Sequence, residues 1–164
     1  MFSPTIDVLE IVQEDGHDSV QRVEASFLME SLQSFDFSFT LHLMKNVLGI
    51  TNDLSLALQR KDQDIVNAMT LVKVSKQRLQ VMRDDGWETL LNEVSSFCIK
   101  HDIPIPGMDD IFVVRLKSRR KAPQITNVYH YRVELLYTVI DMQLQDLNNR
   151  FSEASTELLF CVAY

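Results

Sequence analysis

Hydrophobic residues recur along most of this chain every three or four positions, which is the spacing of one face of an α-helix. The clearest run follows Ser34, a residue that caps helices well, and comprises Phe35, Phe39, Leu43, Val47 and Ile50. Phe35 to Leu43 also alternates with polar residues, so a strand is the competing interpretation. We favour a helix, because the helical period continues through Leu48, beyond the length of an ordinary strand. Gly49 is expected to limit this helix.

Two shorter helices are predicted before Ser34. Ser3 and Pro4 suit the start of the first helix, and its apolar positions (Ile6, Leu9 and Val12 or Ile11) end at Asp15–Gly16. The second is predicted from Ser19 to Gln33. We expect its large apolar side chains to face inward: Val20, Val23, Phe27 and Leu28.

After Gly49 the pattern predicts three further helices. Asn52 can cap a brief helix that ends at Leu58, and Asp62 can cap the longest helix, which stops at Asp84–Asp85–Gly86. Its apolar stripe is Ile65, Met69, Val72, Leu79 and Met82. A third amphipathic helix follows and ends before Pro104 and Pro106; its apolar positions are Trp87, Leu90, Leu91, Val94, Phe97 and Cys98.

The remaining chain divides into a predicted loop and a predicted long helix. Residues 104–125 are flanked by Pro, carry basic residues and lack a helical period, so we interpret them as a long exposed loop. Thr126 begins a pattern that continues to about Arg150, a helix of roughly 35 Å. Its apolar positions are Tyr129, Val133, Leu136, Ile140, Leu144 and Leu147. Both long stripes are expected to face a core rather than a partner. Ser152 can cap a final short helix.

These patterns predict a single all-α domain over 1–164, a helical bundle of about six to seven helices with one long Pro-flanked basic loop. Its expected parts are N-terminal helices (1–33), main helices (34–103), the loop (104–125), and a long helix followed by a short one (126–164). With 46% hydrophobic residues the chain can form a core, and four Gly and four Pro are too few turns for a β-sandwich or barrel.

Charge and cysteine content restrict the class of protein. A formal charge of −7 disfavours general binding to a phosphate backbone. Cys98 and Cys161 lie in apolar helical patterns, so we expect buried thiols and a reducing compartment. The N-terminus lacks a signal-peptide pattern and no apolar run reaches the length of a membrane span, which predicts an intracellular chain with no membrane contact. The chain stops within the apolar run ELLFCVAY, which we interpret as truncation of a longer ancestor.

Residues that could carry chemistry are scattered. The four histidines stand singly, no HExxH or GxSxG motif occurs, and the four glycines are isolated. The acidic residues in predicted turns are more simply helix caps or hydrated groups than metal ligands: Asp15, Asp84, Asp85, Asp109 and Asp110. We therefore expect no catalytic residue, metal, cofactor or small-molecule substrate, and no enzyme activity.

One local excess of positive charge opposes the acidic whole. It comprises Arg115, Lys117, Arg119, Arg120 and Lys121. This run could contact DNA phosphates or an acidic partner, or act as a nuclear-import signal. We favour a solvated linker, because basic residues alone give a salt-dependent contact without sequence specificity.

Three segments resemble the plant hAT-type transposase-derived proteins, commonly labelled zinc finger MYM-type or TTF-type proteins. The segments are SFDFSFTLHLMKNVLGITNDLSLALQRKDQDIVNAMTLV, RDDGWETLLNEVSSFCIKHDIPIP and HYRVELLYTVIDMQLQDLNNRFSEASTELLFCVA. In that family a large all-helical insertion interrupts an RNase H-like nuclease core with an acidic triad, and this chain resembles the insertion. No segment matches the family's zinc finger, its acidic triad or its C-terminal dimerisation region.

The resemblance implies a non-enzymatic remnant of a hAT-type transposase-like protein, a helical scaffold and protein-interaction domain without the nuclease core. Its implied partners are copies of itself or related transposase-like chains, and its implied location is the nucleus. The alternative is a nucleic-acid-binding module that uses the basic residues 115–121 for a weak DNA contact.

Overall fold

The computed structural model describes residues 2–16, 18–61, 64–113 and 125–152, and these ranges are mostly helical. The elements are α1 (Phe2–Asp15), α2 (Ser19–Leu32), α3 (Phe35–Leu58), α4 (Ile65–Asp85), α5 (Trp87–Lys100), α6 (Asn127–Tyr129), η1 (His130–Tyr137) and α7 (Thr138–Arg150). Within the described ranges, β-pairing is limited to one isolated bridge, between Ile111 and Thr126. The predicted all-α helical bundle is confirmed.

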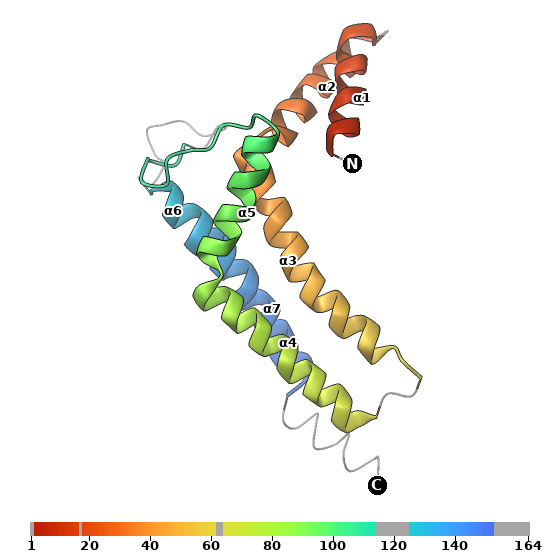
Figure 1. Cartoon of the computed structure of the whole chain (residues 1–164). Helices are drawn as coiled ribbons and strands as arrows, with labels where there is room; N and C mark the ends of the chain where they lie inside the picture. The colour runs from red at the N-terminus through yellow and green to blue at the C-terminus, as the bar shows by residue number, and fades with distance from the viewer. Residues whose placement is uncertain (1, 17, 62–63, 114–124, 153–164) are drawn as a thin grey trace.

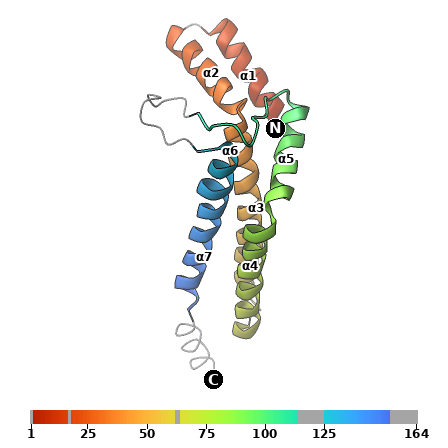
Figure 2. The same cartoon turned by 90° about the vertical axis from the view of Figure 1, so that its left-hand side faces the viewer.

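Three long rods lie side by side and form the bundle (Figures 1 and 2). The first is α3, the second is α4 continued by α5, and the third is the unbroken succession α6–η1–α7. The chain runs along α3, returns along α4 and α5, and descends again along α7. α3 packs against both α4 and α5, and α7 packs against α4. No described helix has the length and apolar character needed to cross a bilayer.

Polar side chains begin these helices at or near the predicted positions. The Ser34 hydroxyl accepts a hydrogen bond from the Phe37 amide at 3.2 Å, and the Thr126 hydroxyl accepts one from the Tyr129 amide at 3.4 Å. The predicted cap Ser34 is confirmed, and the last helical pattern begins at Thr126 as predicted, with that residue as its cap. The predicted cap Asp62 lies outside the described residues. The carboxylate of Asp64 caps α4 instead, by accepting a hydrogen bond from the Val66 amide at 2.7 Å.

α3 is longer than its sequence pattern predicted. It continues through Gly49 and Asn52 to Leu58, and its 24 residues exceed the 21 of α4. The predictions of a helix end at Gly49 and of a separate helix capped by Asn52 were therefore wrong. The helix predicted after Asp62 is present as α4 and ends at Asp85 as expected, but it is not the longest. A glycine inside a helix costs about 1 kcal/mol relative to alanine. Burial of Ile50 and Leu54, just past it, offsets that cost.

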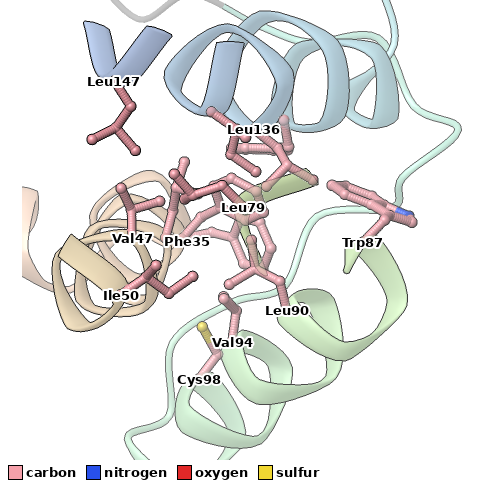
Figure 3. Close-up of a cluster of buried hydrophobic side chains, with 14 of the residues drawn as sticks. Phe35, Val47, Ile50, Leu79, Trp87, Leu90, Val94, Cys98, Leu136 and Leu147 are labelled. Atoms are coloured by element: carbon pink, nitrogen blue, oxygen red, sulfur yellow. The ribbon is translucent and has the colours of Figure 1, made fainter. Parts of the chain in front are cut away.

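The core is one cluster at the meeting of the three rods (Figure 3). Phe39 of α3 lies at its centre, with its ring centroid 4.9 Å from that of Tyr131 and 6.0 Å from that of Trp87. The buried members also include Leu79 and Leu136. Both long stripes thus face a core, as predicted, except that Tyr129 is 47% exposed.

The C-terminal rod spans nearly the predicted range but is not a regular α-helix throughout. Its middle, η1, is a π-helix of eight residues, which sequence periodicity did not predict. There the Arg132 guanidinium lies 5.9 Å from the Trp87 ring centroid, and its Nε donates a hydrogen bond to the Tyr137 hydroxyl at 2.9 Å. The irregular segment therefore faces the start of α5.

The predicted loop 104–125 is described at its two ends. Residues 104–113 contain no helix. The amide of Phe112 donates to the Ile125 carbonyl at 2.8 Å, and the amide of Asn127 donates to the Asp110 carbonyl at 2.9 Å. These hydrogen bonds hold the two ends of the segment together. Residues 114–124 lie outside the described ranges.

α1 and α2 form a hairpin at one end of the bundle (Figure 1). Both helices occupy their predicted positions. The predicted inward face of α2 was wrong: Val20, Val23, Phe27 and Leu28 are 59%, 70%, 66% and 50% exposed, whereas Ala25 is buried. The sequence pattern assigned the largest apolar groups to a core, but α2 packs mainly against α1 and lies outside the cluster of the bundle.

Candidate interaction surface

The described residues do not assemble a metal centre. Within the ranges that the structure describes, no group of three or more His, Cys, Asp or Glu side chains is placed to hold an ion. Nδ1 of His42 lies 2.8 Å from the Ser38 carbonyl oxygen, and Nδ1 of His130 lies 2.7 Å from a Glu134 carboxylate oxygen. The His130 ring also stacks on Phe112, with 3.7 Å between centroids. These histidines have local structural partners.

The basic residues singled out by the sequence, Arg115, Lys117, Arg119, Arg120 and Lys121, all lie outside the described residues. Their contact with DNA or with an acidic partner stays a prediction.

An arginine–carboxylate pair joins α4 to α7. Arg83 donates to Asp141 through Nε at 2.5 Å and through a terminal nitrogen at 3.1 Å, and its guanidinium lies 4.7 Å from the Tyr137 ring centroid. The hydrogen bond from Arg83 lowers the pKa of Asp141, and the same bond raises the pKa of Arg83. The pair fixes two rods to each other and does not form a reactive site.

Replacing Arg83 with Gln is expected to raise the pKa of Asp141 toward its ordinary range, because the charge-assisted hydrogen bond is lost. The folded-state pKa lies below the unfolded one, so the pair stabilises the fold above the unfolded pKa. That contribution disappears as the pH falls through the folded pKa. NMR titration of the Asp141 carboxyl carbon measures the shift. Arg150→Gln, which breaks the neighbouring pair with Asp146, is the control and should leave the Asp141 pKa unchanged. An equal shift in both variants would contradict the assignment.

Cys98 is a buried thiol, as predicted, while Cys161 lies outside the described residues. Burial raises the pKa of the Cys98 thiol, and a hydrogen bond with Ser38 only partly opposes this. Because the thiolate is the reactive form, native Cys98 is expected to resist a thiol reagent at pH 8. A Cys161→Ser variant isolates the reaction, and the same variant in urea should react fully. Rapid labelling without denaturant would show that the site is open.

The hairpin carries large apolar side chains on its outside. We define the outer stripe as Val8 and Ile11 of α1 together with Val20, Val23 and Phe27 of α2; all five are at least 58% exposed. On α2 these residues recur at helical spacing on the side opposite buried Ala25. α2 is thus apolar on two sides, and a helix of that kind is ordinarily covered on both sides.

A hollow of about 480 Å³ lies where α2 meets α3. We call it the junction hollow, and its lining residues are Phe27, Glu30, Ser31, Ser34, Asp36, Phe37 and Thr40. Phe27 links it to the outer stripe. On α3, exposed Leu41 and Met44 continue the face of Phe37 at helical spacing. The hollow therefore joins two exposed apolar faces.

A second cleft of about 490 Å³ adjoins the hollow and shares Glu30, Ser34 and Asp36 with it. Its lining includes Asp110 and the aromatic rings of Phe112 and Tyr131. The Tyr131 hydroxyl donates a hydrogen bond to the Asp36 carboxylate. This hydrogen bond connects the start of α3 to η1. Asp36, one of the two carboxylates at the junction hollow, is therefore held by a residue of the bundle core.

Sequence periodicity alone missed this surface. It identified the apolar residues of α2 but placed them inside, because a period shows that one face is apolar without showing which core receives it. The signal that could have revealed the surface was that α2 has apolar residues on two sides, Ala25 and Met29 on one and Val20, Val23 and Phe27 on the other.

The chain is similar over part of its relatives' length to known proteins. The chain is 25% identical over 144 residues to the mouse protein "52 kDa repressor of the inhibitor of the protein kinase". The alignment covers 85% of this chain and 18% of that protein, so the chain spans less than a fifth of its relative. No family model and no solved structure matches the chain.

Proposed function

We propose that this chain is a helical scaffold and protein-interaction domain without enzyme activity, derived from the helical insertion of a hAT-type transposase-like protein. The observation that carries the interaction role is the outer stripe. The hairpin buries Ile6 and Ala25 among its described residues but leaves the five large apolar side chains of the outer stripe in solvent. Val20, Val23 and Phe27 recur at helical spacing on one side of α2, and an exposed apolar face of that kind is a candidate binding site.

The ancestry is supported by where the resembling segments lie. The first covers α3 and the start of α4, the second covers α5, and the third includes η1 and α7. They therefore supply most of the buried bundle, which is the part that a helical insertion needs in order to fold. Under this ancestry we expect a nuclear location, and partners that are copies of the chain or related transposase-like proteins.

The proposal that the chain has no enzyme activity comes from its sequence, which contains no catalytic motif. A metal-dependent nuclease needs carboxylates held rigidly around its ions, and the described residues form no such group. The name of the mouse relative describes a repressor of an inhibitor. A regulatory role carried out through binding would fit the same proposal for this chain.

Chemical crosslinking tests the interaction role. A hairpin variant, Val23→Ser with Phe27→Ser, removes two residues of the outer stripe; a control variant, Val66→Ser with Met142→Ser, removes two exposed apolar side chains elsewhere. Wild-type and control chains are expected to form the same crosslinks with themselves or with proteins of a nuclear extract. The hairpin variant should lose them. Equal crosslinking by all three chains would reject the hairpin as the binding face.

A nicking assay tests the absence of catalysis. Purified chain is incubated with supercoiled DNA and Mg²⁺ or Mn²⁺, and the DNA is expected to remain uncut. Nicking that copurifies with the chain and persists in the hairpin variant would overturn the non-enzymatic part of the proposal.

A further inference from the structure

Nearly all of the imbalance of charge in this chain lies in its first part. Residues 1–44 contain eight acidic side chains and one basic side chain, Arg22, which gives a formal charge of −7. Residues 45–164 contain fifteen acidic and fifteen basic side chains, so they are formally neutral. The hairpin and the start of α3 therefore carry the whole net charge of the protein.

The same part of the chain carries the outer stripe and the junction hollow. Phe27 and Phe37 give the hollow its aromatic lining, and Glu30 and Asp36 place two carboxylates at it. None of the residues that line the hollow is basic. Its volume of about 480 Å³ is in the range of about 300–1,000 Å³ that is usual for small-molecule pockets, so it has room for a side chain of a partner. The surface is thus both apolar and acidic.

We propose that the junction hollow binds a basic amphipathic helix of a partner protein, with an apolar side chain of that helix between Phe27 and Phe37. This proposal rests on the interaction role proposed above and specifies the partner's chemistry. Lysine or arginine side chains that flank the anchor reach Glu30 and Asp36. The helix lies along the apolar face, which extends from Val23 on α2 to Leu41 and Met44 on α3. In this mode of binding an amphipathic helix places its apolar face in a groove, and the apolar side chains that enter the groove recur at helical spacing.

The acidic charge of residues 1–44 favours a basic helix over nucleic acids, anionic membranes and a second copy of the hairpin as the partner. Nucleic acids and anionic membranes would be repelled by a segment of charge −7 whose hollow is lined by two carboxylates and no basic residue, because both owe much of their affinity for proteins to Lys and Arg. A second copy meeting this surface with its own hairpin would bring two such charges together. A basic helix gains from the same field, which accelerates its encounter and strengthens its contacts at low salt.

The test uses the full chain and three fluorescent helical peptides of about 18 residues, roughly 27 Å of helix. All three have leucine and phenylalanine at the same positions. The remaining positions are Lys and Arg in the basic peptide, Gln in the neutral peptide and Glu in the acidic peptide. Fluorescence anisotropy measures binding. The basic peptide is expected to bind at least about tenfold more tightly than the neutral one, and the acidic peptide most weakly. Raising the salt from about 50 to 500 mM should remove most of the difference.

Two variants locate the site. Phe27→Ser should weaken all binding by removing the apolar wall of the hollow, and Glu30→Lys should weaken the basic peptide by about tenfold while strengthening the acidic one. Met142→Ser and Glu88→Lys make the same kinds of change on the bundle and should leave binding unchanged. Circular dichroism verifies that all four variants keep the wild-type helix content.

Each contrary outcome is distinct. Equal or tighter binding of the neutral or acidic peptide overturns the basic partner but leaves the interaction role, which is decided by crosslinking of the hairpin variant. Binding of the basic peptide that survives both Phe27→Ser and Glu30→Lys places the site elsewhere and overturns the proposal. Failure of all three peptides overturns it as well.

Discussion

Replacing Phe39 with Ala is expected to lower the free energy of unfolding by about 3–5 kcal/mol. Its side chain is fully buried, and its ring lies against those of Tyr131 and Trp87, which belong to the other two rods. Truncation removes contacts to both rods and leaves a cavity that rigid neighbouring helices fill only partly. A domain of this size has a total stability of about 5–15 kcal/mol, so the variant should be close to its unfolding threshold. Urea denaturation followed by circular dichroism measures the loss.

Phe27→Ala is the matched control for this substitution. It is the same chemical change at a side chain that is 66% exposed, and the stability should change by no more than about 0.5 kcal/mol. A loss comparable to that of Phe39→Ala would show that Phe27 is buried and that the outer stripe is part of the core.

Leu79→Ala is expected to cost about 2–5 kcal/mol. Leu79 is fully buried on α4, the helix that packs against both α3 and α7. Losing its side chain therefore weakens the contact of the middle rod with its neighbours. The effect should be seen as a lower midpoint of urea unfolding with little change in its slope, because the compactness of the two end states is unchanged.

Val81→Ala, two residues further along the same helix, provides the control. Val81 is 55% exposed, so its truncation removes little buried surface and should cost no more than about 0.5 kcal/mol. If the two substitutions had equal effects, α4 would be rotated about its axis from the orientation described above.

The buried face of α3 could be predicted from the sequence because several independent signals agreed. Ser34 supplied a cap, and Phe35, Phe39, Leu43, Val47 and Ile50 supplied an unbroken helical period; all five are buried. α5 was predictable for the same reason, with Trp87, Leu90, Val94 and Cys98 inside. Where cap, period and end signal coincide, the local sequence determines both the helix and its inner face.

Elements that depend on distant contacts were not predictable in this way. The sequence offers a break at Gly49, but burial of Ile50 and Leu54 against the bundle carries α3 through it. The π-helix η1 has no local signature, and its position beside Trp87 became visible only in the folded chain. Local propensities give way to tertiary packing at both places.

The candidate site was predicted least well. The sequence drew attention to the basic run, which lies outside the described residues, and assigned Val20, Val23 and Phe27 to the core. The relevant property was the coincidence of acidic charge and two-sided apolarity in the first 44 residues. Neither property alone indicates a binding surface, because acidic helices are usually solvated and apolar helices are usually buried.

The hairpin contributes none of the described members of the central cluster, which begins at Phe35. α1 and α2 should therefore behave as a separate cooperative unit whose amide hydrogens exchange through local opening while those of α3 and α5 remain protected. A helix bound at the junction hollow would be detected as slower exchange in α2 and in the first turns of α3. Because the central cluster contains no described residue of the hairpin, substitutions on the outer stripe are expected to leave the bundle folded. Under the interaction role proposed above, such substitutions are expected to change which partner is bound while the bundle stays the same.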